Sequence, residues 1–104
     1  MNLRKFARNQ ECQIRLIGCD GGGDTTVLAH YRMSPYAGMG MKPPDIMSAW
    51  ACGSCHDYVD NRKPYEGDRM AVRLAHAEGC LRTIVALEKE GKIQCGMNNN
   101  RRTT

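Results

Sequence analysis

Alternating apolar and polar side chains mark the first predicted strand of this chain. Over residues 11–17, Cys12, Ile14 and Leu16 fall on one side and the residues between them fall on the other. A two-residue period of this kind is typical of a half-buried strand. Several glycines follow, so we expect the strand to end in flexible turns.

Residues 25–31 are rich in β-branched side chains and predict a second strand. Prolines and glycines between residues 32 and 44 predict a long irregular loop, which in a small domain is usually functional. Residues 47–51 can form a short strand that places the lone tryptophan in the core. The segment 53–61 has the length of a short helix, with Ser54 as its N-cap.

The longest predicted helix covers residues 68–90. Its apolar residues recur at alternating steps of four and three: Met70, Leu74, Ala77, Leu81 and Ile84. We expect this stripe to pack onto the rest of the domain, although the same spacing can also pair with a partner helix. His76 lies off the stripe, so we expect it to face solvent.

Length and charge describe a small domain with a polyanionic partner. A chain of 104 residues makes about one domain, which we place at residues 1–94, followed by a polar basic tail at 95–104 that we expect to be disordered. The net charge is +4 and the basic residues are clustered, which favours nucleic acid as the partner. No segment is apolar enough to suggest a membrane span. We expect a monomer or a homodimer.

Four cysteines form two pairs that are far apart in the sequence, namely Cys12 with Cys19 and Cys52 with Cys55. Two such pairs predict one structural Zn²⁺ site with four thiolate ligands, which would staple a core this small. A set of disulfides is the alternative staple. The first residues do not read as a signal peptide, so we expect a reducing, cytoplasmic location and favour zinc.

Two histidines are candidates for catalysis. His56 and Asp60 are four residues apart, so on a helix they share a face and can hold a divalent ion such as Mg²⁺, Mn²⁺ or Zn²⁺. His30 ends a predicted strand, and if it faces His56 it can take a proton from a water that attacks phosphorus. The predicted reaction is phosphodiester hydrolysis. The basic side chains that we expect to bind nucleic acid are Arg32, Lys42, Arg62 and Lys63, although each can also be an ordinary surface residue.

Several short segments together resemble a known family. They are Leu3-Arg4-Lys5, Glu11-Cys12-Gln13, Val27-Leu28-Ala29-His30, Lys42-Pro43-Pro44-Asp45 and Cys52 through Asp57 with Asp60. This set is similar to the His-Me finger (HNH-type, ββα-metal) nucleases, in the zinc-bearing branch of small phage and prophage proteins typified by YbcO.

The resemblance implies an α+β fold, namely a zinc-braced ββα-metal finger to which we add an N-terminal strand and a long C-terminal helix. It also implies an endonuclease encoded by a phage or prophage and acting in a bacterial host, with His30 as general base and His56 and Asp60 as metal ligands. Members commonly carry a metal ligand directly before the base, where this chain has Ala29. The middle asparagine of the family name has Asp45 or Ser48 as its nearest counterpart.

Two rival interpretations remain open. Cys52 to His56 also fits the CxxCH pattern of covalent haem attachment, although that chemistry normally requires export and would leave Cys12 and Cys19 without a role. The more serious alternative is a zinc-braced DNA-binding or adaptor module that performs no chemistry, in which Ala29 marks the loss of the catalytic metal.

Overall fold

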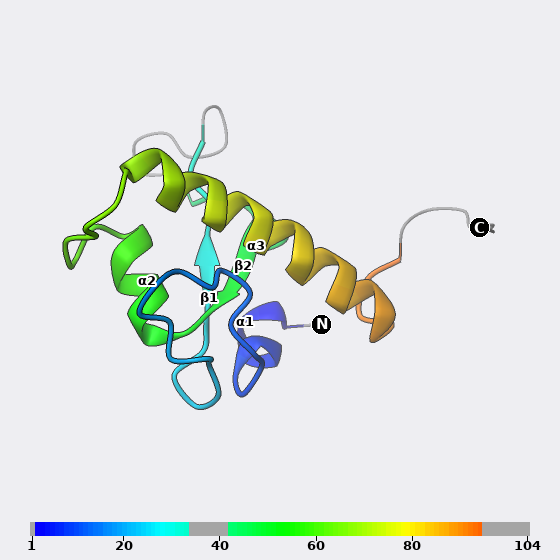
Figure 1. The fold of residues 1–104 in the computed structure, drawn as a ribbon. Helices are drawn as coiled ribbons and strands as arrows, with labels where there is room; N and C mark the ends of the chain where they lie inside the picture. Colours follow the sequence, from blue (N-terminus) through cyan, green and yellow to red (C-terminus); the bar gives the residue numbers. More distant parts are fainter. Residues whose placement is uncertain (1, 34–41, 95–104) are drawn as a thin grey trace.

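The computed structural model describes residues 2–33 and 42–94. It is a small α+β structure with the element order α1 (Leu3–Ala7), β1 (Val27–His30), β2 (Ser48–Ala51), α2 (Gly53–Val59) and α3 (Arg69–Lys89). Figure 1 shows α3 running beside the two-stranded sheet, with α2 near its N-terminal end and α1 nearer its C-terminal half. Within the described ranges, no helix has the length and apolar character needed to cross a bilayer. The predicted tail and most of the predicted loop, residues 34–41, lie outside the described residues.

The two strands form an antiparallel hairpin whose faces have different partners. Leu28 is paired with Trp50 and His30 with Ser48, while Ala29 is paired with Ala49 on the other face. Ala29 and Ala49 belong to the core cluster that contains the cysteines. Leu28 and Trp50 instead pack with α1. The strand pairing therefore points His30 toward the face that α1 covers.

The predicted strand over residues 11–17 is wrong, and so is the N-terminal strand in the expected fold class. This segment is irregular and forms one isolated bridge, between Glu11 and Gly22, because Arg15 adopts φ 63°, which interrupts an extended chain. The alternation nevertheless identified the buried side, since Cys12, Ile14 and Leu16 are all buried. The N-terminal element is instead the short helix α1.

Helix α2 is capped by a cysteine. Cys52 is the N-cap, and its sulfur accepts a hydrogen bond from the Cys55 amide at 3.3 Å. The prediction that Ser54 is the N-cap is therefore wrong. The helix ends at Val59, with Asp60 as its C-cap.

Helix α3 turns a different face to the core than its apolar stripe predicts. The buried residues are Val72, His76, Gly79, Cys80, Thr83 and Leu87. Met70, Leu74 and Leu81 are 70%, 60% and 63% exposed, so the prediction that the stripe is the packing face is wrong.

Close backbone contacts explain the choice of face. A Cβ on Gly79 would lie 3.0 Å from the Gln13 carbonyl oxygen, so only glycine lets the helix approach this closely. Thr83 Oγ1 accepts a hydrogen bond from the Trp50 amide at 3.0 Å, on the outer edge of β2. A polar side chain on α3 thus provides a hydrogen-bond partner for the backbone at the edge of β2, which a leucine could not do.

The prediction that His76 faces solvent is also wrong. His76 is 5% exposed, and its Nε2 lies 2.9 Å from the carbonyl oxygen of Ala29. Its ring also meets the ring of Tyr31 edge-on, with centroids 4.9 Å apart. Burial lowers the pKa of His76 below its ordinary value of 6.5, so the ring is neutral at neutral pH.

Candidate functional site

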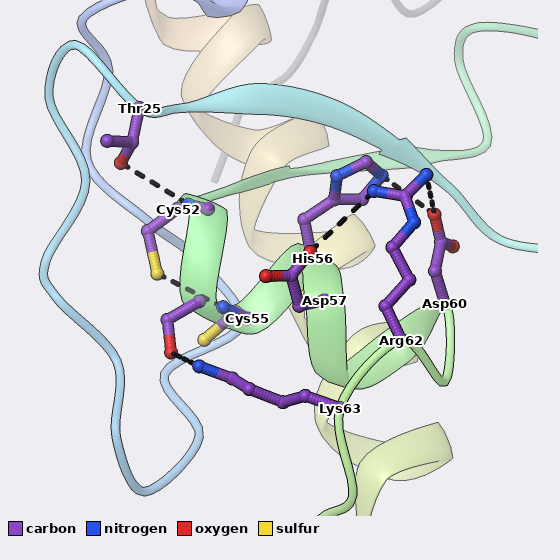
Figure 2. A network of polar contacts seen from close by, with 10 residues as sticks. Thr25, Cys52, Cys55, His56, Asp57, Asp60, Arg62 and Lys63 are labelled. Atoms are coloured by element: carbon purple, nitrogen blue, oxygen red, sulfur yellow. Dashed lines mark hydrogen bonds and ion pairs between the residues drawn. The ribbon is translucent and has the colours of Figure 1, made fainter.

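The four cysteines expected to bind metal lie together. Cys12 and Cys19 come from the irregular N-terminal segment, while Cys52 and Cys55 come from the start of α2 (Figure 2). Their sulfurs all lie within 4.8 Å of one another, and those of Cys19 and Cys52 are 3.8 Å apart. The disulfide alternative is not realised among the described cysteines, all of which are free.

The cysteine cluster fits a tetrahedral metal. Four sulfurs held about 2.3 Å from a zinc ion are about 3.8 Å from one another, which matches the Cys19–Cys52 separation. Backbone amides also point at the sulfurs, from Gly21 to Cys19 at 3.3 Å and from Asp20 to Cys52 at 3.4 Å. Amide donors of this kind stabilise thiolates and orient them. The four cysteines can therefore hold a structural metal such as zinc.

The cysteine cluster already favours one thiolate. A hydrogen bond from the Cys55 thiol lowers the pKa of Cys12 to about 4, while sharing that proton with Cys12 raises the pKa of Cys55. Burial raises the pKa of Cys19 to about 11. Metal binding must remove the remaining thiol protons, so we expect the affinity for zinc to fall as the pH falls.

His56 and Asp60 meet near the C-terminal end of α2, as Figure 2 shows. His56 Nε2 lies 3.1 Å from Asp60 Oδ2, and both side chains are partly exposed. Arg62 reaches the same carboxylate at 3.3 Å and Asp57 at 3.6 Å. The short helix thus brings an imidazole, a carboxylate and a guanidinium to one exposed place.

Lys63 lies further from this group. Its Nζ donates a hydrogen bond to Ser54 Oγ at 3.0 Å and stands 4.7 Å from the centre of the Tyr58 ring. Lys63 follows α2 in the chain, but these contacts hold its ammonium beside the start of that helix, nearer the cysteine cluster than His56 is.

His30 is held by a carboxylate that sequence reasoning did not select as a site residue. His30 Nε2 lies 2.7 Å from Asp45 Oδ1, and Arg4 Nε lies 3.6 Å from the same oxygen. The hydrogen bond from His30, followed by the charge of Arg4, lowers the pKa of Asp45 below its ordinary value of 3.8. An ionised carboxylate only accepts hydrogen bonds, so Nε2 carries the proton and Nδ1 of the neutral ring is left as an acceptor.

A basic cavity of about 460 Å³ opens beside His30. Four cationic side chains line it: Arg4, Arg8, Arg32 and Lys42. The first two come from α1 and the segment directly after it, and the others flank the described ends of the loop that follows β1. We call this feature the His30 pocket. Its positive lining makes it a place where a phosphate can bind.

Sequence reasoning missed two residues that line the His30 pocket, Arg4 and Arg8, and a third, Asp45, that contacts His30. Arg4 and Arg8 are four residues apart beside the N-cap Asn2, a spacing that marks one side of a helix, but α1 was not predicted. Asp45 directly follows two prolines and was noted only for its place in the family pattern.

The structure arranges the predicted site residues in three groups. His30, Arg32 and Lys42 share the His30 pocket, and the four cysteines form the metal-binding cluster. His56, Asp60, Arg62 and Lys63 lie on or just after α2. Among the described residues, the four cysteines are the only group of three or more potential metal ligands whose ligand atoms all lie within 4.8 Å. That His30 and His56 act on one ion stays a prediction.

Comparison with known proteins gives a consistent result. The family model described as "Putative nuclease YbcO" matches residues 1–92. Two curated relatives are "Putative nuclease YbcO" of Escherichia coli (strain K12) and "Putative nuclease ybcO" of Enterobacteria phage 82. Each is 45% identical over 94 residues, which cover 89% of this chain and 97% of the relative.

A solved structure is similar as well, "Structure of a putative bacteriophage protein from Escherichia coli str. K-12 substr. MG1655". The TM-score is 0.73 at 42% identity, and the match covers 86% of this chain and 100% of that one. Both the family model and the identity to the relatives extend over most of the chain. The chain therefore belongs to the family described as "Putative nuclease YbcO".

Proposed function

We propose that this protein is a metal-dependent endonuclease of the HNH (His-Me finger) type that hydrolyses phosphodiester bonds of DNA. The observation that carries the proposal is the short hydrogen bond between the Asp45 carboxylate and His30, whose ring lines a basic pocket. Membership of a family whose relatives are named nucleases supports it. Function of this kind needs a base, a phosphate site and a cation, and each has candidate residues.

His30 is the general base in this proposal. Asp45 accepts the Nε2 proton and so fixes the tautomer, which leaves Nδ1 to take a proton from water. Asp45 also balances the positive charge that the ring gains when it accepts this proton. Arg4, 3.6 Å from Asp45, keeps the carboxylate ionised and in place. The three side chains thus form a chain that prepares one ring nitrogen for proton transfer.

The basic residues of the His30 pocket bind the phosphate backbone. Arg4, Arg8, Arg32 and Lys42 surround the ring with cationic donors that match phosphate oxygens. Arg62 and Lys63 add positive charge along α2. Contacts of this type position a nucleic acid without reading its sequence.

Two metals complete the proposal. The four cysteines hold a structural Zn²⁺, and His56 with Asp60 would hold a divalent ion, Mg²⁺, Mn²⁺ or Zn²⁺. When bound, that ion would neutralise charge that grows on the phosphate and the leaving oxygen. Thiolate ligands persist in a reducing compartment, so we propose that the single domain over residues 1–94 acts in the cytoplasm of a bacterial host.

One observation favours a second function, a zinc-braced DNA-binding or adaptor module. Ala29 supplies no ligand before His30, and within the described ranges no third His, Cys, Asp or Glu joins His56 and Asp60 with its ligand atom within 4.8 Å. A two-ligand platform binds an ion weakly in the absence of substrate. The adaptor would keep the basic pocket and the zinc but would not cut DNA.

Supercoiled plasmid DNA distinguishes the two functions. The zinc-loaded wild type is incubated with the plasmid in Mg²⁺, Mn²⁺ or Zn²⁺, beside His30→Ala and His56→Ala. We expect cutting by the wild type and a loss on the order of 10²- to 10⁴-fold in His30→Ala, the usual contribution of a general base. His56→Ala should need a higher metal concentration or lose activity.

Equal zinc content and equal thermal unfolding of the three proteins serve as the folding control. If the wild type retards the plasmid in a gel without cutting it in any of the three metals, the protein is the adaptor. If His30→Ala cuts as fast as the wild type, His30 is not the base.

A further inference from the structure

Helix α3 leaves an apolar stripe uncovered. Met70, Leu74 and Leu81 are 70%, 60% and 63% exposed, and Ala77 and Ile84 complete the same line along the helix. The steps between these five residues alternate between four and three, which is the spacing of the a and d positions of a coiled coil. We call these five residues the α3 seam. The face of α3 that packs on the sheet lies elsewhere on the helix, so the seam is not needed for the core.

Apolar surface continues beside the α3 seam. A cavity of about 300 Å³ lies between the helix and the start of β2, lined by Tyr31, Ile46 and Met47 with Ala77, Leu81 and Ile84. Ile46 is 38% exposed, and Val85, next to the seam, is 50% exposed. Contiguous exposed apolar surface of this kind marks an interaction site rather than ordinary solvated surface.

We propose that the α3 seam pairs in parallel with the α3 seam of a second copy of this chain. An a/d stripe is self-complementary, because in a parallel pair each a or d residue packs against the same residue of the other helix. This inference is independent of the proposed nuclease activity. It concerns a face that carries none of the residues of the His30 pocket.

The charges beside the α3 seam set the orientation. Arg73 and Glu78 are five residues apart and flank the seam on opposite sides, at g and e positions. In a parallel pair, a g residue meets the e residue five positions later on the other helix, so Arg73 of each copy meets Glu78 of the other. An antiparallel pair that uses Leu74, Ala77, Leu81 and Ile84 would instead bring the two copies of Glu78 together.

Arg73 is prepared for such a contact. Its Nη1 donates to the Arg32 carbonyl at 3.1 Å, and its guanidinium stands 4.3 Å from the centre of the Tyr31 ring. These contacts hold the side chain at the edge of the seam and use few of its five donors. The Glu78 side chain is 56% exposed and its nearest described cation, Arg82, is 3.9 Å away, so it is available to a second copy.

The α3 seam spans only two heptads, fewer than an isolated coiled coil needs, so the dimer should depend on protein concentration. Sedimentation velocity of the zinc-loaded full chain tests this. We expect the mass to rise from 11.6 kDa toward twice that value with concentration. Leu74→Glu with Leu81→Glu should remain monomeric, whereas Ile17→Glu, at a site 84% exposed and away from the seam, should behave as the wild type.

Two single charge reversals test the orientation. Glu78→Arg places two arginines at each g–e contact and Arg73→Glu places two glutamates there, so each variant alone should dimerise less. Mixed in equal amounts, they should form a heterodimer with opposite charges at both contacts. A monomer at every concentration, or a dimer unchanged by Leu74→Glu with Leu81→Glu, would overturn the proposal. A mixture no more dimeric than its components would overturn the parallel pairing.

Discussion

The cysteine cluster and the His30 pocket hold polar side chains in opposite surroundings. Cys12, Cys52 and Cys55 are at most 4% exposed. In the pocket, the side chains of Arg4 and His30 are 51% and 17% exposed, and that of Asp45, which contacts both, is 42% exposed. The cysteine cluster joins the N-terminal segment to α2, whereas the pocket is open to a ligand. The cysteine cluster therefore supports the fold, whereas the His30 pocket can bind or release a ligand without disturbing the fold.

The largest effect should follow the loss of one cysteine of the cluster. Cys52→Ser removes a ligand and the N-cap sulfur of α2, so we expect loss of zinc and of most of the folded structure. A structural zinc contributes about 10 kcal/mol or more in small zinc modules, which exceeds the stability of most domains this small. Zinc content by mass spectrometry and unfolding by circular dichroism measure the result.

Cys80→Ser is the matched control. Cys80 is also buried, and burial raises its pKa to about 11, but it lies outside the cysteine cluster. The variant should keep one zinc per chain and lose far less stability than Cys52→Ser. Equal zinc content in Cys52→Ser and in the wild type would contradict the role of the cysteine cluster.

The next effect compares two histidines on either side of β1. His76 supports the strand from behind by donating to the Ala29 carbonyl, while His30 faces the pocket. We expect His76→Ala to lose about 2 to 4 kcal/mol of unfolding free energy, from the cavity and the unpaired carbonyl. His30→Ala should change stability much less. Urea denaturation of both variants makes the comparison.

Acid sharpens the same comparison. Because burial lowers the folded pKa of His76 below 6.5, its contribution to stability is fully present above pH 6.5 and is lost as the pH falls through the folded pKa. The difference in stability between the wild type and His76→Ala should therefore shrink below pH 6.5. A difference that stays constant down to pH 5 would show that His76 is not buried in its neutral form.

A smaller effect should follow the loss of the Asp45 carboxylate, which positions the His30 ring. The amide of Asp45→Asn can donate to Nε2, which favours the tautomer with the proton on Nδ1 and removes the acceptor. We expect plasmid cleavage to fall by about 10- to 100-fold in kcat with little change in KM. Asp45→Glu should restore part of the rate, and Glu66→Gln, an exposed control, should have none of this effect. An unchanged rate in Asp45→Asn would remove Asp45 from the mechanism.

Local sequence pattern predicted the elements better than their packing. The β-branched run before His30 and the four-and-three spacing along α3 correctly identified a strand and a long helix. The prediction of the buried face of α3 was wrong because that face depends on contacts distant in sequence. Gly79 lies against Gln13, and Thr83 bonds to Trp50, and both partners lie more than thirty residues earlier. Contacts between distant backbone groups leave no periodic signal in the chain.

For the same reason, the sequence predicted one part of the candidate site, the cysteine cluster, and missed another, the partners of His30. Paired cysteines predict a metal-binding cluster because few other residues supply thiolate ligands, and the four sulfurs do lie together. The partners of His30 are less distinctive, since arginines and aspartates are common on every surface. Asp45 is fifteen residues from His30, and Arg4 is further still, so only the folded chain brings them into one contact.

The smallest effect tests whether the pocket binds a phosphate backbone. Arg8, the C-cap of α1, lines the His30 pocket, while Lys5, three residues earlier within that helix, does not. Arg8→Ala should weaken binding of duplex DNA by up to about tenfold and reduce the slope of log affinity against log salt by about 1, because one fewer counterion is released. Lys5→Ala carries the same change in net charge, so it separates a contact from a general field. If both variants shift the slope equally, the phosphate is attracted by the whole basic surface and not by the pocket, and the open region then has no defined occupant to compare with the cysteine cluster.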